Sequence, residues 1–273
     1  MKMKNVEDVY PLSPMQKGLL FHSLYSRERG AYVEQVGWTF EGRLNNLALE
    51  HAWQEVIARH PALRTCFFWE DLKQPLQVVR QRVELPWQRY DWRNLSAQGQ
   101  HERLQTFLES DRRRDFQLTK APLMRLSQAR LAEDSHQFIW TYHHVILDGW
   151  SISLVLRELF QCYETLCSGI QPELARPRPF RDYIAWLEQQ DKEQAEIYWR
   201  ERLRDFVGPG SLSFEKSSEG AVSYATQEVR LSPTATGSLR TVARQHQLTL
   251  SVLVEAAWAL LLSSYNEAVD VVF

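Results

Sequence analysis

The stretch that decides the fold is TYHHVILDGWS, residues 141–151, which joins an apolar run to an Asp-Gly pair and a second apolar period. Just upstream, HQFIWT supplies the aromatic and β-branched residues of a β-strand. Successive side chains of a strand point to opposite faces. His144 therefore shares a face with Trp140 and Tyr142, whereas His143 lies on the other face.

The two adjacent histidines leave more than one reading open. Side chains on opposite faces of a strand do not reach one metal ion, and no third ligand lies nearby at metal spacing, so no metal site is predicted. A single histidine is more often a hydrogen-bonded structural residue than a catalyst. With an ordinary pKa of about 6.5 it can also take or hold a proton at neutral pH, as acyl transfer to an amine or alcohol requires.

The pair Asp148-Gly149 also has two readings. Asp-Gly is a turn signal, and an acidic residue just before a helix caps its N-terminus. In the other reading, Asp148 forms a charge-assisted pair with an arginine and so holds the strand end and His144 in position. The spacing favours neither.

The surrounding sequence predicts a mixed order of strands and helices. The turn AEDS joins two strands as a hairpin, at 121–131 and 136–145, and the period of 150–167 predicts a helix that Gly169 ends. Upstream, the predicted elements are a helix from Ser13 with Gln16 closing a capping box, a strand at 32–42, a helix over 49–57 ended by Pro61, strands at 63–70 and 76–81, and a polar helix at 97–113.

The last third begins with a proline-rich connecting segment at 171–180 and a helix at 181–190. A Gly- and Ser-rich run at 208–220 predicts a linker. Beyond it we expect, in order, a strand at 227–232, a helix at 234–245, an apolar helix at 248–265 and a strand at 268–273. Glu255 interrupts the apolar run, which favours a buried helix over a membrane span. The chain thus ends on a predicted strand rather than on a finished domain.

The composition, 44% hydrophobic and 24% charged over 273 residues, is that of an ordinary globular protein. A net charge of −2 with interspersed signs argues against nucleic acid or an anionic membrane as a partner. The run DRRRD at 111–115 predicts a solvated helix face. Three cysteines without zinc spacing, and a start without a signal peptide, predict a reducing, cytoplasmic location.

Four motifs together carry a resemblance to a known family. HHVILDG at 143–149 has the form HHxxxDG, and it occurs in order with YPLSPMQKGLLFHSL at 10–24, RHPALRTCF at 59–67 and FRDYIAWLEQQ at 180–190. Over essentially its full length the chain resembles the condensation domain of nonribosomal peptide synthetases. HHxxxDG alone is only moderately specific, but four motifs in family order are a strong signal.

The resemblance implies an α/β fold like that of chloramphenicol acetyltransferase. Two similar lobes, each an α+β sandwich with a mixed β-sheet and flanking helices, would form a V with a tunnel between them. Residues 1–170 would be the N-terminal lobe, 171–220 the connecting helices and linker, and 221–273 the beginning of a truncated C-terminal lobe. The tunnel needs both lobes, and most of the second is missing from the chain.

The implied reaction is amide formation between two carrier-bound substrates. The amine of an aminoacyl group on a downstream peptidyl carrier protein would attack the thioester of an aminoacyl or peptidyl group on an upstream one. Both substrates would ride on 4′-phosphopantetheine arms, with no cofactor bound directly by the chain. The remaining C-terminal lobe and an adjacent adenylation domain are the other implied partners.

The motifs also imply roles for single residues. His144 matches the family's active-site histidine and His143 the histidine before it, while Asp148 matches an aspartate regarded as structural. Arg64 matches the arginine expected to pair with that aspartate, and Gly149 would let the backbone turn close to the substrates. A thioester is already activated and an amine already nucleophilic, so proximity can carry most of the rate. General-base and positioning roles for His144 stay equally open.

Several alternatives compete with this reading. The intact histidine pair argues against heterocyclisation domains, which carry aspartates there, and the first motif favours condensation of an L-configured donor over epimerisation. A non-catalytic docking platform for carrier proteins and a free-standing acyltransferase that uses coenzyme A remain. The linker-like opening at 4–14 favours a module downstream of a carrier domain.

Overall fold

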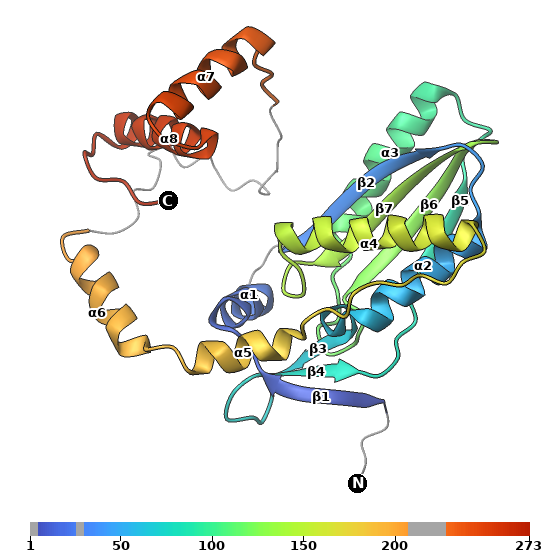
Figure 1. Ribbon diagram of the computed structural model, residues 1–273, viewed down its shortest axis with the longest axis horizontal. Coiled ribbons are helices and arrows are strands. Elements are labelled where there is room, and N and C mark those ends of the chain that lie inside the picture. Colours follow the sequence, from blue (N-terminus) through green and yellow to red (C-terminus); the bar gives the residue numbers. More distant parts are fainter. Residues whose placement is uncertain (1–4, 26–29, 207–227) are drawn as a thin grey trace. The chain divides into compact units, whose positions relative to one another are not determined.

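A computed structural model describes residues 5–25, 30–206 and 228–273 of the chain (Figure 1). Backbone contacts divide it into two compact units, Met1–Gln190 and Asp191–Phe273, which are described separately. The predicted lobe boundaries at 170 and 220 stay predictions.

The larger sheet of the first unit has four strands in the order β2-β7-β6-β5. They are β2 (Val33–Glu41), β5 (Trp87–Asp91), β6 (Met124–Ala132) and β7 (Ser135–His143). β5 runs parallel to β6 and the other pairs are antiparallel, so the sheet is mixed as predicted. The predicted hairpin is confirmed, with Met124 opposite Tyr142. β5 was not among the predicted strands.

A second, antiparallel sheet has the order β1-β4-β3, formed by β1 (Val6–Pro11), β3 (Thr65–Phe68) and β4 (Leu76–Arg80). The prediction of a linker-like opening is wrong for residues 6–11, because they pair with β4. Only Tyr10 of β1 is buried, and its acidic neighbours hide the strand in the sequence. Residues 63 and 64, expected as the start of a strand, instead belong to the short helix η1 (Pro61–Arg64), because proline suits a first helical turn.

Helices cover the sheets as the sequence predicts. The first unit contains α1 (Pro14–Tyr25), α2 (Asn46–Arg59), α3 (Ala97–Arg112), α4 (Gly149–Cys167) and α5 (Phe180–Glu188). α2 and α4 lie side by side across the larger sheet (Figure 1). The capping box of α1 is confirmed, because the amide of Ser13 donates to the Gln16 side chain and the amide of Gln16 to the Ser13 hydroxyl.

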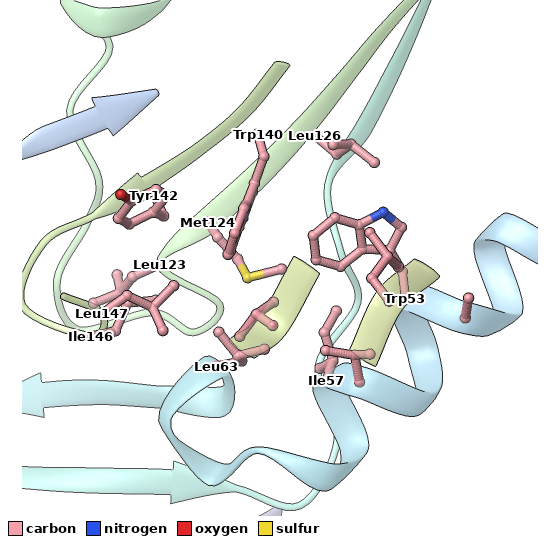
Figure 2. Packing of buried hydrophobic residues seen from close by; sticks show 14 of the residues in the cluster. Trp53, Ile57, Leu63, Leu123, Met124, Leu126, Trp140, Tyr142, Ile146 and Leu147 are labelled. Carbon is pink, nitrogen blue, oxygen red and sulfur yellow. The ribbon is translucent and has the colours of Figure 1, made fainter. Parts of the chain in front are cut away.

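One hydrophobic cluster joins these layers. The indoles of Trp53 on α2 and Trp140 on β7 lie 5.3 Å apart, edge to face, and both are buried. Figure 2 shows Ile146 and Leu147, from the loop after β7, in the same packed cluster as Leu63. The loop behind the two histidines is therefore anchored in the core.

The basic run at 111–115, which begins in the last turn of α3, differs partly from its prediction. Its three arginines are exposed, but Asp111 is buried and forms an ion pair with Arg125 at 2.7 Å, so the predicted solvated face is wrong for that residue. Arg125 also donates to the backbone carbonyl of Asp111, and Thr141 of β7 donates to the Asp111 carboxylate. This buried pair is compensated by hydrogen bonds and ties α3 to β6 and β7.

The second unit contains α6 (Lys192–Arg202), α7 (Pro233–Gln245) and α8 (Leu250–Asn266). The two predicted helices at 234–245 and 248–265 are confirmed. The prediction that the apolar helix is buried is wrong, because only Leu262 of α8 is buried while Leu260 is 73% exposed. In the described part of the chain, 228–232 and 268–273 pair with no strand, contrary to prediction; a strand needs a neighbour for its backbone groups. The predicted linker at 208–220 lies outside the described residues.

Within the described ranges, no single helix is long and apolar enough to cross a membrane. α7 and α8 meet that criterion only as a pair, bent by 100° at their junction.

Candidate active site

The two histidines at the end of β7 point apart, as the strand period predicts. His143 is the last residue of β7 and only 3% exposed. His144 is partly exposed and lines a cavity of about 650 Å³. The backbone amide of His144 donates to the carbonyl of Tyr32 at 2.8 Å, which extends the β2 pairing by one step.

His143 is held as a neutral ring with a defined tautomer. Its Nδ1 accepts the backbone amide of Val145 at 3.1 Å and therefore carries no proton. Its Nε2 lies 3.1 Å from the hydroxyl of Ser23, whose own hydrogen points to the Leu19 carbonyl at 2.7 Å. Nε2 is therefore the donor. Burial lowers the pKa of His143 to about 4, and the neighbouring His144 acts in the same direction.

His144 has the opposite arrangement. Its Nδ1 lies 2.6 Å from the backbone carbonyl of Leu147, and a carbonyl only accepts hydrogen bonds, so Nδ1 carries the proton. The lone pair of the neutral ring then lies on Nε2. A ring held in this way can accept a proton or a hydrogen bond from a group in the cavity.

The cavity beside His144 is mostly apolar and lies within the first unit. Its wall comes from α1, η1, the loop after β7, the start of α4 and residues leading into α5. Met15 and Leu154 contribute apolar surface, Tyr183 an aromatic ring and Arg178 a cation. A largely apolar cavity with polar side chains in its wall suits an organic substrate.

Asp148 supports α4 rather than pairing with an arginine. Its carboxylate accepts from the backbone amide of Ser151 at 2.8 Å and from the Ser151 hydroxyl at 2.6 Å, which makes it the N-cap of α4. The hydrogen bond from that hydroxyl holds the pKa of Asp148 below its usual range. The helix-cap reading from the sequence is confirmed.

Arg64 belongs to η1, and its side chain is buried against the C-terminal end of α2. Its guanidinium donates to the Ile57 carbonyl at 3.0 Å and the Ala58 carbonyl at 3.1 Å, which caps the last turn of the helix. It also donates to the Arg80 carbonyl and forms an ion pair with Glu7 at 2.5 Å. The side chain thus joins α2 to β1 and β4.

The predicted pairing of Arg64 with Asp148 is therefore wrong. The two residues line different cavities, and among the described residues no arginine forms an ion pair with Asp148. The acidic partner of Arg64 lies on β1, which the sequence did not reveal as a strand. The pairing with Asp148 was implied only by the resemblance to the family's motifs.

Gly149 begins α4 with an ordinary helical backbone. A Cβ at this position would meet no heavy atom within 4 Å, and its φ lies outside the range that favours glycine. The backbone conformation itself therefore does not require glycine at this position. Close approach of a substrate to Gly149 stays a prediction.

Sequence reasoning missed two polar residues of α1 beside the site. Gln16 is buried, and its side-chain amide donates to the carbonyl of Val145 at 3.1 Å and to Gln77 at 3.3 Å. Ser23 contacts His143 as described above. Gln16 was recognised only as part of a capping box, and Ser23 gave no signal, because neither motif nor period connects α1 with β7.

No group of three or more histidine, cysteine or acidic side chains with metal-binding geometry occurs among residues 5–25, 30–206 and 228–273. His144 and Arg178 are among the polar residues that line the cavity and are suited to hydrogen bonding with a substrate.

Comparison with known proteins adds the family context. A family model described as "Condensation domain" matches residues 6–273. The chain is 45% identical over 274 residues to part of a linear gramicidin synthase of Brevibacillus parabrevis and 37% identical over 270 residues to part of a mycosubtilin synthase of Bacillus subtilis. These alignments cover 99% and 98% of the chain but only 4% and 10% of the two relatives.

Solved structures show the same fold. The starter condensation domain of rhizomide synthetase matches 96% of this chain and 59% of that one, with a TM-score of 0.78 at 20% identity. The first condensation domain of the calcium-dependent antibiotic synthetase matches 97% and 63%, with a TM-score of 0.76 at 19% identity. The predicted fold class is confirmed.

Proposed function

Because the chain belongs to the condensation-domain family, we propose that the domain containing it forms amide bonds in a nonribosomal peptide synthetase. The chain spans a small fraction of the synthetases it matches, so this is a proposal about the larger domain. The observation that carries it is the orientation of His144, whose Nδ1 is occupied by a backbone carbonyl and whose ring lines an apolar cavity.

In the proposed reaction an amine nitrogen attacks a thioester carbon. The C–N bond forms, the C–S bond breaks, and the amine loses one proton while the leaving thiolate gains one. Nε2 of His144 can accept that proton or hold the amine by a hydrogen bond. Positioning of two bound substrates supplies most of the rate, and general-base help adds about 10²–10⁴-fold.

The substrates are aminoacyl or peptidyl thioesters on the 4′-phosphopantetheine arms of an upstream and a downstream carrier protein. The rest of the C-terminal lobe completes the tunnel, and an adenylation domain loads the downstream carrier. The synthetase works in the cytoplasm. Support for these partners is the family membership and the similarity to synthetases such as that of linear gramicidin.

The test is peptide-bond formation in a single turnover, with the domain that contains this chain and two loaded carrier proteins. We expect product with the natural residue. For His144→Ala we expect the single-turnover rate constant to fall by up to about 10²–10⁴-fold, the range that acid–base catalysis supplies. Product at an undiminished rate in His144→Ala would overturn the catalytic assignment.

Two further arms of this experiment separate the alternatives. Carrier binding without product would favour a docking platform, and efficient use of free coenzyme A thioesters in place of carriers would favour a free-standing acyltransferase. The intact HHxxxDG sequence at 143–149 favours the condensation reading over both.

A further inference from the structure

The peptide groups on both sides of Val145, the residue after His144, are held from α1. The amide of Val145 donates to His143 Nδ1 at 3.1 Å, and the carbonyl of Val145 accepts from the Gln16 side chain at 3.1 Å. His143 in turn bonds to Ser23 of α1. One helix therefore fixes the backbone immediately behind the active-site histidine from two directions.

Gln16 and Ser23 are spaced to act together. They are seven residues apart, which is two turns of an α-helix, so they lie on the same face of α1. Gln16 is 7% exposed and Ser23 is partly buried, both facing the end of β7. Gln16 reaches the Val145 carbonyl directly, whereas Ser23 acts on the Val145 amide through the His143 ring.

The Gln16 side chain has little freedom to leave its position. Its oxygen accepts from the amide of Ser13 at 3.0 Å and from the Gln77 side chain at 3.1 Å. Gln77, which is 1% exposed, also donates to the carbonyl of Pro11 at 2.8 Å. The donor that meets Val145 is thus built into a buried network joining α1 and β4.

The direction of each hydrogen bond on the amide side of Val145 is also fixed. The hydrogen of the Ser23 hydroxyl goes to Leu19, so the oxygen accepts from His143 Nε2, and His143 Nδ1 is free to accept from Val145. Protonation of Nδ1 would break the last of these bonds. Burial of His143, which lowers its pKa, keeps the ring in the neutral form that this chain of bonds needs.

We infer that Gln16 and Ser23 are positioning residues that set the direction of the His144 ring, an inference that rests on the proposed function for its catalytic consequence. They act through Val145, which lies between His144 and the Leu147 carbonyl that holds its Nδ1. Ile146 and Leu147 are buried in the core, so the loop stays folded when one of these bonds is removed. Removal of one of these bonds changes the orientation of the His144 ring in the cavity.

The decisive variants are Ser23→Ala and Gln16→Met, with Ser23→Thr as the conservative rescue. Ser110→Ala is the matched control, because the Ser110 hydroxyl also donates back to its own helix, at Phe107, away from the site. Nitrogen-15 NMR of labelled histidine in this chain reads the tautomer and environment of both rings. Steady-state kinetics of the domain that contains the chain, which give kcat and KM, read the catalytic consequence.

We expect Ser23→Ala and Gln16→Met to shift the His144 signals in the chain and to lower kcat about 10-fold or more with KM changed less than about 2-fold. Ser23→Thr restores both readouts, and Ser110→Ala changes neither. Folded variants with unchanged His144 signals and unchanged kcat would overturn the inference. If the domain with natural residues makes no product, the proposed function fails. The NMR result then still decides whether α1 determines the orientation of the His144 ring.

Discussion

At the scale of single residues, two chemically identical side chains next to each other do different work. His143 is enclosed by β7, α1 and the aromatic rings of Tyr32 and Phe116, with both ring nitrogens used in internal bonds. His144 gives one nitrogen to the backbone and presents the ring to the cavity. The strand period predicted this division, but the partners that enforce it were not visible in the sequence.

The lowered pKa of His143 makes the stability of the chain depend on pH. Its folded value is about 4, against an ordinary value of 6.5. Above pH 6.5 the ring is neutral in both states and the full stability is present; between 6.5 and 4 the unfolded state binds the extra proton. The contribution of His143 to the free energy of unfolding therefore falls by about 1.4 kcal/mol per pH unit as pH drops through that window.

Denaturant unfolding of the chain with natural residues and of His143→Asn at several pH values between 7 and 4 measures this effect. Asparagine retains an acceptor near the position of Nδ1 but does not titrate. We expect the pH slope to be flatter in His143→Asn than in the chain with natural residues. Equal slopes in the two proteins would show that His143 is not held neutral.

At the scale of elements, the pattern of the sequence predicted the pieces that are strongly apolar or that bury one face periodically. The β6–β7 hairpin is buried over most of its length, α2 and α4 each bury one face, and the ends of these elements carry turn or cap residues. β1 was missed because the adjacent acidic residues Glu7 and Asp8 interrupt its apolar pattern at a sheet edge. The strands expected at 228–232 and 268–273 lack a neighbour among the described residues, which no local pattern reveals.

In the candidate site too, the sequence predicts local contacts better than contacts between distant elements. Contacts within one element, such as the Asp148 cap on Ser151, follow from spacing. Contacts between distant elements do not, which is why the partner of Arg64 was assigned wrongly and Gln16 was not placed beside the histidine loop.

The role of Arg64 as a connector of β1, α2 and β4 is testable by a double-mutant cycle. Arg64→Met leaves helix-end carbonyls and Glu7 without a partner, so we expect a loss of about 3 kcal/mol in the free energy of unfolding. With Glu7→Gln the coupling energy should be about 0.5 kcal/mol or more, because the two side chains are in contact.

Asp148→Asn is the matched comparison, since asparagine retains the helix cap. Its coupling energy with Arg64→Met should lie within about 0.5 kcal/mol of zero, as for separate sites. Coupling larger than that with Asp148, and none with Glu7, would restore the pairing that the motif implied.

At the scale of the whole molecule, the two units differ in how much they bury. Most of the buried core belongs to the first unit, where it joins both sheets and α2 and α4. In the described part of the second unit the buried apolar side chains are Ala243 and Leu262, while Leu260 and Trp258 of α8 are exposed. Stability of the second unit within this chain is therefore low.

Amide hydrogen exchange tests this difference directly. We expect slow exchange in β2, β6 and β7, set by global unfolding, and fast exchange throughout α7, α8 and residues 268–273. Protection of α8 equal to that of β7 in the present chain would contradict this account.

The central claim is that the fold gives the two histidines opposite proton arrangements, leaving Nε2 of His144 as the acceptor in the cavity. Long-range proton–nitrogen NMR correlation of labelled histidine in the folded chain tests it most directly. The account predicts the Nε2–H tautomer for His143 and the Nδ1–H tautomer for the neutral form of His144. An Nε2–H tautomer for His144, or a charged His143 at neutral pH, would contradict it.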